Sequence, residues 1–170
     1  MVNPGMSNAI GAIRIRMKRG INLAVRDSKT SDPYIIVALG EQKVRTRTIK
    51  NTLNPEWNED LTLCVTDPNQ PLKLFVYDYD TFSPDDVMGE AEIDLRPFLN
   101  AVKSNVEGIP NGTIITQVTP NRLNSISEDS SIVFNDGEVT QNMFLRLHNV
   151  ECGEVELELK WIDLPTSRVA

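Results

Sequence analysis

Two acidic, turn-forming stretches follow short apolar runs in this sequence: Arg26-Asp27-Ser28-Lys29-Thr30-Ser31-Asp32-Pro33-Tyr34 and Tyr77-Asp78-Tyr79-Asp80-Thr81-Phe82-Ser83-Pro84-Asp85-Asp86. Asp27 and Asp32 are five residues apart, whereas Asp78 and Asp80 are two apart. Carboxylates crowded in this way repel one another and favour a cation among them. Because the ligands on offer are oxygen atoms on flexible loops, Ca²⁺ suits them better than Mg²⁺ does.

Either stretch alone has a simpler explanation, because Asp forms turns by bonding its own backbone. An EF-hand loop also fits poorly. After Asp78 and Asp80 the next ligand position is Phe82, and Ser83 replaces the glycine that the EF-hand turn needs. Taken together, at these spacings, the two stretches favour a bound cation over simple turns.

Length and charge restrict the class of protein. The chain has 170 residues, the size of one ordinary domain, and a net charge of −7. That charge argues against simple nucleic-acid binding, and no nucleic acid is expected as a partner. Much of the negative charge lies in the two acidic stretches, where a bound cation would reverse its effect. No apolar run reaches the length of a membrane span, so any membrane contact is expected to be peripheral.

Strand-like runs recur at regular spacing, with turn signals between them. In the first run Ile13, Ile15 and Met17 alternate with basic residues, as in a half-buried strand. Such a series indicates an all-β antiparallel sandwich. The expected strands span residues 10–18, 34–39, 42–49, 60–65, 72–77, 88–95, 113–119, 131–134, 138–147 and 154–162.

One segment departs from this pattern before the last strand. Residues 96–106 carry apolar side chains at helical spacing, at Phe98, Leu99, Val102 and Val106. Pro97 suits the first turn of a helix. Further on, Asn135-Asp136-Gly137 is a strong signal for a hairpin turn. The sequence therefore predicts an inserted helix and β-hairpin.

Basic residues share one face of the expected strand 42–49. Lys43, Arg45 and Arg47 follow one another at two-residue spacing, about 7 Å apart. Such a row can simply protect a sheet edge and keep the protein soluble. It can also attract anionic lipid head groups, each cation contributing about 1 kcal/mol near the membrane. We favour the lipid-binding interpretation.

Between the acidic stretches lies Thr52-Leu53-Asn54-Pro55-Glu56-Trp57-Asn58-Glu59, and with them it resembles the C2 domain, a Ca²⁺-dependent phospholipid-binding module. A closer resemblance extends over almost the whole chain. It is to the plant C2-domain abscisic-acid-related proteins, small proteins with one C2 domain. The segments that carry it are Gly20-Ile21-Asn22-Leu23-Ala24-Val25-Arg26-Asp27, Asn54-Pro55-Glu56-Trp57-Asn58-Glu59-Asp60-Leu61-Thr62-Leu63, Leu145-Arg146-Leu147-His148-Asn149-Val150-Glu151-Cys152-Gly153-Glu154 and Trp161-Ile162-Asp163-Leu164-Pro165.

The resemblance implies an eight-stranded antiparallel C2 β-sandwich with an inserted helix and hairpin. Only a short arm precedes the first strand, so its missing neighbour must be the C-terminal strand 154–162. That order corresponds to the type II topology of C2 domains. We expect residues 1–170 to form a single C2 domain, within which residues 96–138 are the extra segment of the family.

The resemblance also implies two sets of site residues. Five carboxylates and the backbone carbonyls of two neighbours would hold Ca²⁺, in two or more ions, whereas Asp85 is left out of the ligand set. The predicted metal ligands are Arg26, Asp27, Asp32, Asp78, Tyr79, Asp80 and Asp86. Phe82 at the loop tip is expected to enter lipid or to cover the base of the loop. The predicted lipid-binding residues are Tyr34, Lys43, Arg45, Arg47, Tyr77 and Phe82.

By resemblance, the function is Ca²⁺-dependent binding to anionic phospholipid membranes and recruitment of abscisic acid receptors to the plasma membrane. The expected locations are the plasma membrane, as a peripheral protein, the cytoplasm and the nucleus. A protein of this kind is not expected to be an enzyme. His148 has no partner acid nearby in the sequence, and Cys64 has no base beside it.

Two alternatives stay open. Some relatives are described as GTPase-activating proteins for an unconventional GTPase, a role that would need an exposed arginine acting on the other protein. Arg96 and Arg122 in the extra segment are the candidates. The chain could instead be a protein-interaction module that needs no Ca²⁺ and binds its partner through residues 96–138.

Overall fold

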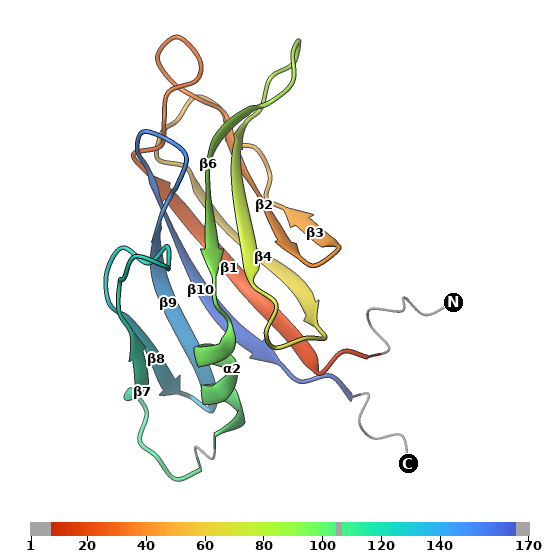
Figure 1. The fold of residues 1–170 in the computed structure, drawn as a ribbon, viewed down its shortest axis with the longest axis vertical. Helices are drawn as coiled ribbons and strands as arrows, with labels where there is room; N and C mark the ends of the chain where they lie inside the picture. The colour runs from red at the N-terminus through yellow and green to blue at the C-terminus, as the bar shows by residue number, and fades with distance from the viewer. Residues whose placement is uncertain (1–7, 105–106, 166–170) are drawn as a thin grey trace.

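The computed structural model describes residues 8–104 and 107–165. Strands follow one another through these residues, with one α-helix after the sixth strand (Figure 1). The elements are β1 (Gly11–Ile21), β2 (Pro33–Leu39), β3 (Gln42–Arg45), β4 (Glu56–Val65), β5 (Leu72–Asp78), β6 (Asp86–Ile93), α2 (Arg96–Lys103), β7 (Thr113–Val118), β8 (Ser130–Asn135), β9 (Glu138–Arg146) and β10 (Glu154–Ile162).

Two antiparallel sheets face each other. One has six strands in the order β4-β1-β10-β9-β8-β7, and the other has four in the order β3-β2-β5-β6. β1 pairs with β4 on one side and with β10 on the other. The first strand therefore has the C-terminal strand as its neighbour, which confirms the type II order. Strands β7 and β8 come in addition to the eight strands of the predicted sandwich.

Alternation along the strands separates core from surface. Ile13, Ile15 and Met17 are all 0% exposed, whereas the basic residues between them face outward. Trp57 on β4 is also fully buried. Burying such a side chain stabilises the fold by about 1.5–3 kcal/mol relative to leaving it in water. The two-residue period in the sequence thus predicted the inward face correctly.

Two strand boundaries differ from the prediction by four residues, more than any other. β3 ends at Arg45, although residues 42–49 were expected to form one strand. The Thr46 hydroxyl accepts the Ile35 amide hydrogen at 3.0 Å and donates to the Arg47 carbonyl at 3.0 Å, so a side chain takes over the bonding of the sheet. β4, expected from residue 60, begins at Glu56.

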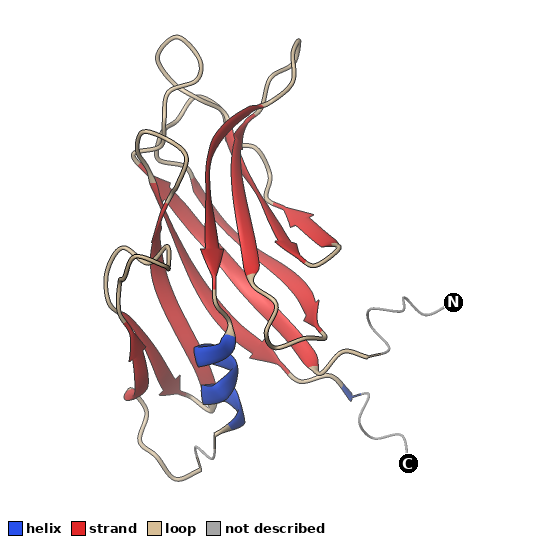
Figure 2. Ribbon diagram, in the orientation of Figure 1, coloured by secondary structure: helices blue, strands red, loops and turns tan. Residues whose placement is uncertain are grey.

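The inserted segment packs on the sandwich as a helix and two strands. Phe98 and Leu99 of α2 are buried, and α2 contacts β7 and β9. The helix begins at Arg96 with Pro97 in its first turn, as predicted, but it ends at Lys103, because Ser104 is extended; Val106 itself lies outside the described residues. Strands β7 and β8 extend the six-stranded sheet beside α2 (Figure 2).

The turn between β8 and β9 is the predicted hairpin turn. Asp136 and Gly137 have φ angles of 49° and 78°, both in the left-handed region, and Asn135 pairs with Glu138 across them. Asp-Gly suits a two-residue turn because Asp tolerates this conformation and glycine adopts it without steric cost.

Antiparallel order brings four connections to one end of the sandwich. These are residues 22–32, 46–55, 79–85 and 147–153, and the first and third reach furthest from the sheets (Figure 1). Both acidic stretches therefore emerge at the same end. Among the described residues, no helix has the length and apolar character needed to cross a bilayer.

Replacing Phe98 by Ala tests whether α2 is docked as described. Phe98 is 0% exposed, so Phe98→Ala is expected to lower the free energy of unfolding by about 3–5 kcal/mol. Urea denaturation measures the loss, and Asn100→Ala on the exposed side of the same helix should change stability by no more than about 0.5 kcal/mol. A loss below about 1 kcal/mol for Phe98→Ala would contradict the packing.

Candidate metal centre

Asp32 joins three of the loops at this end. Its amide donates a hydrogen bond to Asp78 Oδ1 at 2.7 Å, and its carbonyl accepts one from the Tyr79 amide at 2.9 Å. Its own Oδ1 accepts a hydrogen bond from the Asn51 amide at 2.7 Å. One residue of the first acidic stretch thus fixes both the 46–55 loop and the start of the 79–85 loop.

The Asn54-Pro55 part of the sequence motif holds the base of these loops. The Leu23 amide donates to the Leu53 carbonyl at 2.9 Å, and the Gly20 amide donates to the Pro55 carbonyl at 2.9 Å. The Asn22 amide donates to Asn54 Oδ1 at 2.8 Å. The motif therefore acts through backbone pairing with the end of β1, which places the first acidic loop.

Three of the predicted ligands converge. Asp27, Asp32 and Asp78 each offer one carboxylate oxygen, and these three oxygens all lie within 4.8 Å of one another. Asp27 is exposed and Asp32 half-buried, whereas Asp78 is 0% exposed. The two remote acidic stretches thus meet, and the exposure of their carboxylates falls from Asp27 through Asp32 to Asp78.

Asp78 is poorly satisfied within this cluster. Its Oδ2 atom is buried and has no hydrogen-bond partner among the described residues. Burial, together with the charges of Asp27, Asp32 and Asp86, raises the pKa of Asp78 to about 6, although the Asp32 amide opposes the shift. A buried polar atom without a partner typically costs about 1–3 kcal/mol. A divalent cation would supply both the missing partner and the opposite charge, so the residues present fit a metal.

The two other predicted carboxylate ligands, Asp80 and Asp86, lie outside the cluster of three. The Asp80 carboxylate accepts hydrogen bonds from the Phe82 amide at 2.9 Å and from Ser83 Oγ at 2.7 Å, and these bonds lower its pKa. Asp86 is exposed at the start of β6, where its charge acts on Asp78 and Arg26. In this structure the Asp80 carboxylate therefore stabilises the turn that it begins, whereas Asp86 lies at the side of the site.

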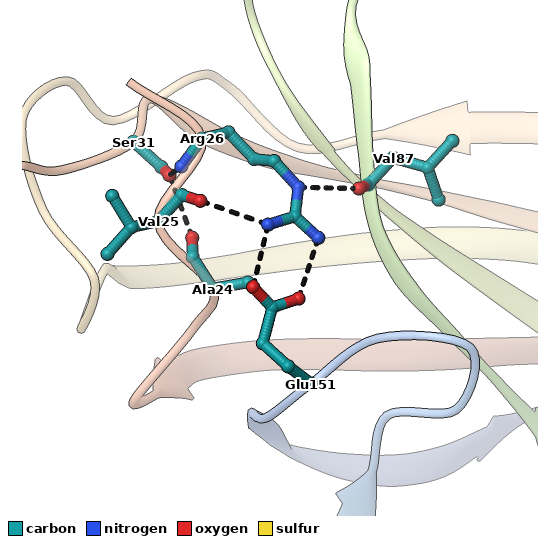
Figure 3. A network of polar contacts seen from close by, with 6 residues as sticks. All are labelled: Ala24, Val25, Arg26, Ser31, Val87 and Glu151. Atoms are coloured by element: carbon teal, nitrogen blue, oxygen red, sulfur yellow. Dashed lines mark hydrogen bonds and ion pairs between the residues drawn. The ribbon is translucent and has the colours of Figure 1, made fainter. Parts of the chain in front are cut away.

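Arg26 connects the first acidic loop to two further elements (Figure 3). Its Nη1 and Nη2 atoms donate to the two carboxylate oxygens of Glu151 at 2.9 and 2.8 Å, and its Nε donates to the Val87 carbonyl at 3.2 Å. This forked pair raises the pKa of Arg26 and lowers that of Glu151 to about 2. Glu151 was missed in the sequence, since it lies 125 residues from Arg26.

Two of the predicted lipid-binding residues, Tyr34 and Tyr77, pair across β2 and β5 next to the metal cluster, whereas Lys43 pairs with Ala38 further along β2. The Arg45 guanidinium carbon is 3.7 Å from the centre of the Tyr34 ring, and Tyr34 stacks on Tyr77 with centroids 5.6 Å apart. Lys43 is exposed on β3. Arg47, in contrast, has its Nη1 atom 3.7 Å from a carboxylate oxygen of Glu59. The basic row is therefore present, with its third member paired.

Phe82 and Asp85 belong to the same loop but differ in their surroundings. Phe82 is 96% exposed at the loop tip and covers nothing, so the prediction that it lies over the loop base is not what this structure has. Asp85, left out of the predicted ligand set, accepts hydrogen bonds from the Tyr34 hydroxyl and from the Asp80 amide.

Comparisons with known proteins agree with this geometry. The family model of the C2 domain matches residues 11–108. The chain is 59% identical over 166 residues to Protein C2-DOMAIN ABA-RELATED 1 of Arabidopsis thaliana, a match that covers 96% of this chain and 99% of that protein. It is 50% identical over 163 residues to GTPase activating protein 1 of Oryza sativa subsp. japonica, covering 96% and 98%.

Solved structures with the same fold include extended synaptotagmins. A calcium-bound pair of C2 domains from Extended-Synaptotagmin 2 matches with a TM-score of 0.63 and 24% identity, covering 92% of this chain and 47% of that one. A single C2 domain of plant Extended Synaptotagmin 1 matches with a TM-score of 0.60 and 22% identity, covering 92% and 97%. The chain thus spans about half of the first structure and nearly all of the second.

Replacing Asp78 by Asn tests the strain at this site. The unfolded pKa is near 3.8 and the folded pKa near 6, so ionised Asp78 opposes folding at pH 7 and the opposition fades as pH falls through about 6. Without added metal, Asp78→Asn is expected to raise the free energy of unfolding at pH 7 by about 1–3 kcal/mol. The gain should shrink when urea denaturation is repeated near pH 4.5.

The same variant should lose any stabilisation by metal. Millimolar CaCl₂ is expected to raise the melting temperature of the unmodified protein and to leave that of Asp78→Asn unchanged. Asp67→Asn, in the turn after β4, serves as the control and should keep the response. A variant that is less stable than the unmodified protein at pH 7 would contradict the description of Asp78.

Proposed function

Because the chain belongs to the C2-domain ABA-related family of C2 domain proteins, we propose that it binds anionic phospholipid membranes in a Ca²⁺-dependent way. The observation that carries this proposal is the unpartnered Asp78 Oδ2 atom, buried beside the carboxylates of Asp27 and Asp32. The chain then acts as a membrane-docking module and is not itself an enzyme.

Asp27, Asp32 and Asp78 would hold the first ion. Asp80 and Asp86, with the carbonyls of Arg26 and Tyr79, complete the proposed ligand set for two or more ions. These residues would hold Ca²⁺, which would offset the charge of the carboxylates and supply open coordination positions for lipid phosphates. Without Ca²⁺, the same carboxylates repel an anionic surface. The net charge of the loop end would therefore become less negative or positive when metal binds. For an exposed oxygen site, affinities of about 10⁻⁶ to 10⁻³ M are typical before a membrane is added.

The side chains around the site supply the remaining attraction. Lys43 and Arg45 present positive charge on β3, each worth about 1 kcal/mol near an anionic membrane. Phe82 is 96% exposed at the tip, and its transfer into lipid would contribute about 1.5–3 kcal/mol. Tyr34 and Tyr77 support this surface from β2 and β5, and Arg47 contributes once its pairing with Glu59 loosens.

The family membership also supports a role in recruitment. The name of the Arabidopsis relatives contains the words ABA-related, which supports the proposal that abscisic acid receptors are the partners brought to the plasma membrane. The cytoplasm and nucleus are the other proposed locations. Residues 96–138 are the proposed partner surface, and they would also serve a partner if Ca²⁺ were not needed.

A second candidate function is activation of a GTPase. The rice relative is named GTPase activating protein 1, and the inserted segment offers one suitable side chain. Arg96 is held by Asp94, with Nη2 to Oδ2 at 2.9 Å, whereas Arg122 is exposed and makes no ion pair among the described residues. Arg122 is therefore the better candidate for insertion into a nucleotide site.

Vesicle sedimentation tests the membrane proposal. The unmodified protein is expected to pellet with phosphatidylserine vesicles in CaCl₂ and to stay in solution in EGTA. Asp27→Asn/Asp32→Asn removes the charge of two ligands and should raise the Ca²⁺ concentration for half-maximal pelleting by about tenfold or more, because affinity depends on the number of charged ligands.

A matched control changes the charge at the opposite end. Asp67→Asn/Asp136→Asn alters the net charge of −7 by the same two units, and Asn suits both turns. This variant should pellet like the unmodified protein. Ca²⁺-dependent pelleting of Asp27→Asn/Asp32→Asn at the original Ca²⁺ concentration would refute the ligand assignment.

Single-turnover GTP hydrolysis by an unconventional GTPase tests the second function. An arginine inserted in trans can accelerate GTP hydrolysis by about 10³-fold or more. If Arg122 acts in this way, Arg122→Ala should lose most of the acceleration, while Arg96→Ala should retain it. Equal acceleration by both variants and the unmodified chain would exclude Arg122 from that role.

A further inference from the structure

Tyr34 lies between the basic strand β3 and the 79–85 loop, and it contacts both. It is 5% exposed at the start of β2, two residues after Asp32. Its ring stacks on Tyr77 of β5, and the Arg45 guanidinium lies 3.7 Å from the ring centre. Its hydroxyl donates a hydrogen bond to Asp85 Oδ2. One side chain thus contacts the basic strand, the neighbouring strand and the 79–85 loop.

Asp85 connects Tyr34 to the rest of the 79–85 loop. Its other oxygen, Oδ1, accepts the Asp80 amide hydrogen at 2.8 Å. The Asp80 carboxylate in turn accepts the Phe82 amide hydrogen at 2.9 Å. A continuous series of hydrogen bonds therefore runs from the Tyr34 hydroxyl to the backbone of Phe82, through one proposed ligand and one proposed lipid contact.

The Tyr34 hydroxyl is the donor in the bond to Asp85, because an ionised carboxylate only accepts hydrogen bonds. A hydrogen bond from a neutral donor to a carboxylate is among the stronger ones in proteins.

We propose that Tyr34 is a positioning residue that sets the orientation of the 79–85 loop through Asp85 and holds that loop in a fixed place relative to Arg45. The inference rests on the proposed function and deepens it, because it assigns Asp85 to orientation of the loop instead of to metal ligation. Ca²⁺ binding at the loops and anion binding at the basic strand then share one rigid support.

Tyr34→Phe is the informative variant, because it removes only the hydroxyl. The ring stacking and the contact with Arg45 are retained. In metal-free protein, in EGTA, amide hydrogen exchange should become faster at Asp80 and Phe82, about three- to tenfold. Since the Asp80 amide still has Asp85 as an acceptor, faster exchange would report loss of orientation and not of the bond itself.

Ca²⁺ binding gives the second measurement. Calorimetric titration with CaCl₂ is expected to show affinity weakened about three- to tenfold in Tyr34→Phe, and half-maximal pelleting with phosphatidylserine vesicles should shift to match. Asp85→Ala should weaken binding by a similar factor. The double variant should be no weaker than Asp85→Ala, because both changes break the same connection.

Thr48→Val is the matched control. The Thr48 hydroxyl accepts a hydrogen bond from Arg45 Nη2 at 2.9 Å, and among the described residues it has no hydrogen bond to Asp85. This variant removes a hydroxyl beside the same guanidinium and should leave the exchange of Asp80 and Phe82 unchanged. Titration at a temperature well below melting separates these effects from a simple loss of stability.

The failures can be told apart. If Tyr34→Phe matches the unmodified protein in exchange and in Ca²⁺ affinity, the positioning role is overturned while the proposed function stands. An additive double variant would also overturn it, since Tyr34 would then act by another route. If the unmodified protein shows no heat of Ca²⁺ binding and no Ca²⁺-dependent pelleting, the proposed function fails, and this inference fails with it.

Discussion

The structure depends on one unsatisfied group, the buried carboxylate of Asp78 at the end of β5. Its Oδ1 atom accepts the Asp32 amide hydrogen, which joins the two acidic stretches, while its Oδ2 atom has no partner among the described residues. A fold keeps such a group at a cost in stability. An unsatisfied ionisable group of this kind is typical of sites that a ligand completes. The hydrogen bond between Asp32 and Asp78 therefore joins the two loops and also leaves Asp78 Oδ2 available to a cation.

The sandwich makes this juxtaposition possible. Because its strands run antiparallel, connections that are remote in the sequence emerge at the same end. β10 occupies the place beside β1, so the six-stranded sheet is continuous beneath the loops. Backbone pairing at Gly20 and Leu23, together with the Arg26–Glu151 pair, then fixes the loops from both sides.

Local patterns predicted the fold well. Alternation gave the inward face of β1, and Asp136-Gly137 gave the β8–β9 turn, because both depend on neighbours in sequence. The meeting of Asp27 and Asp32 with Asp78 followed from the family resemblance and is confirmed by distance. Glu151 and the role of Asp85 were missed, since each bonds a side chain more than 50 residues away that no local pattern reveals. The early end of β3 depends on the rotamer of Thr46, which a strand pattern does not encode.

Anomalous diffraction from crystals grown with calcium tests the central claim most directly. We predict an ion bonded to Asp78 Oδ2, with an oxygen–metal distance of about 2.3–2.6 Å, and to carboxylate oxygens of Asp27 and Asp32. Ordered loops with no anomalous peak between those three residues, at a calcium concentration that supports vesicle binding, would contradict it.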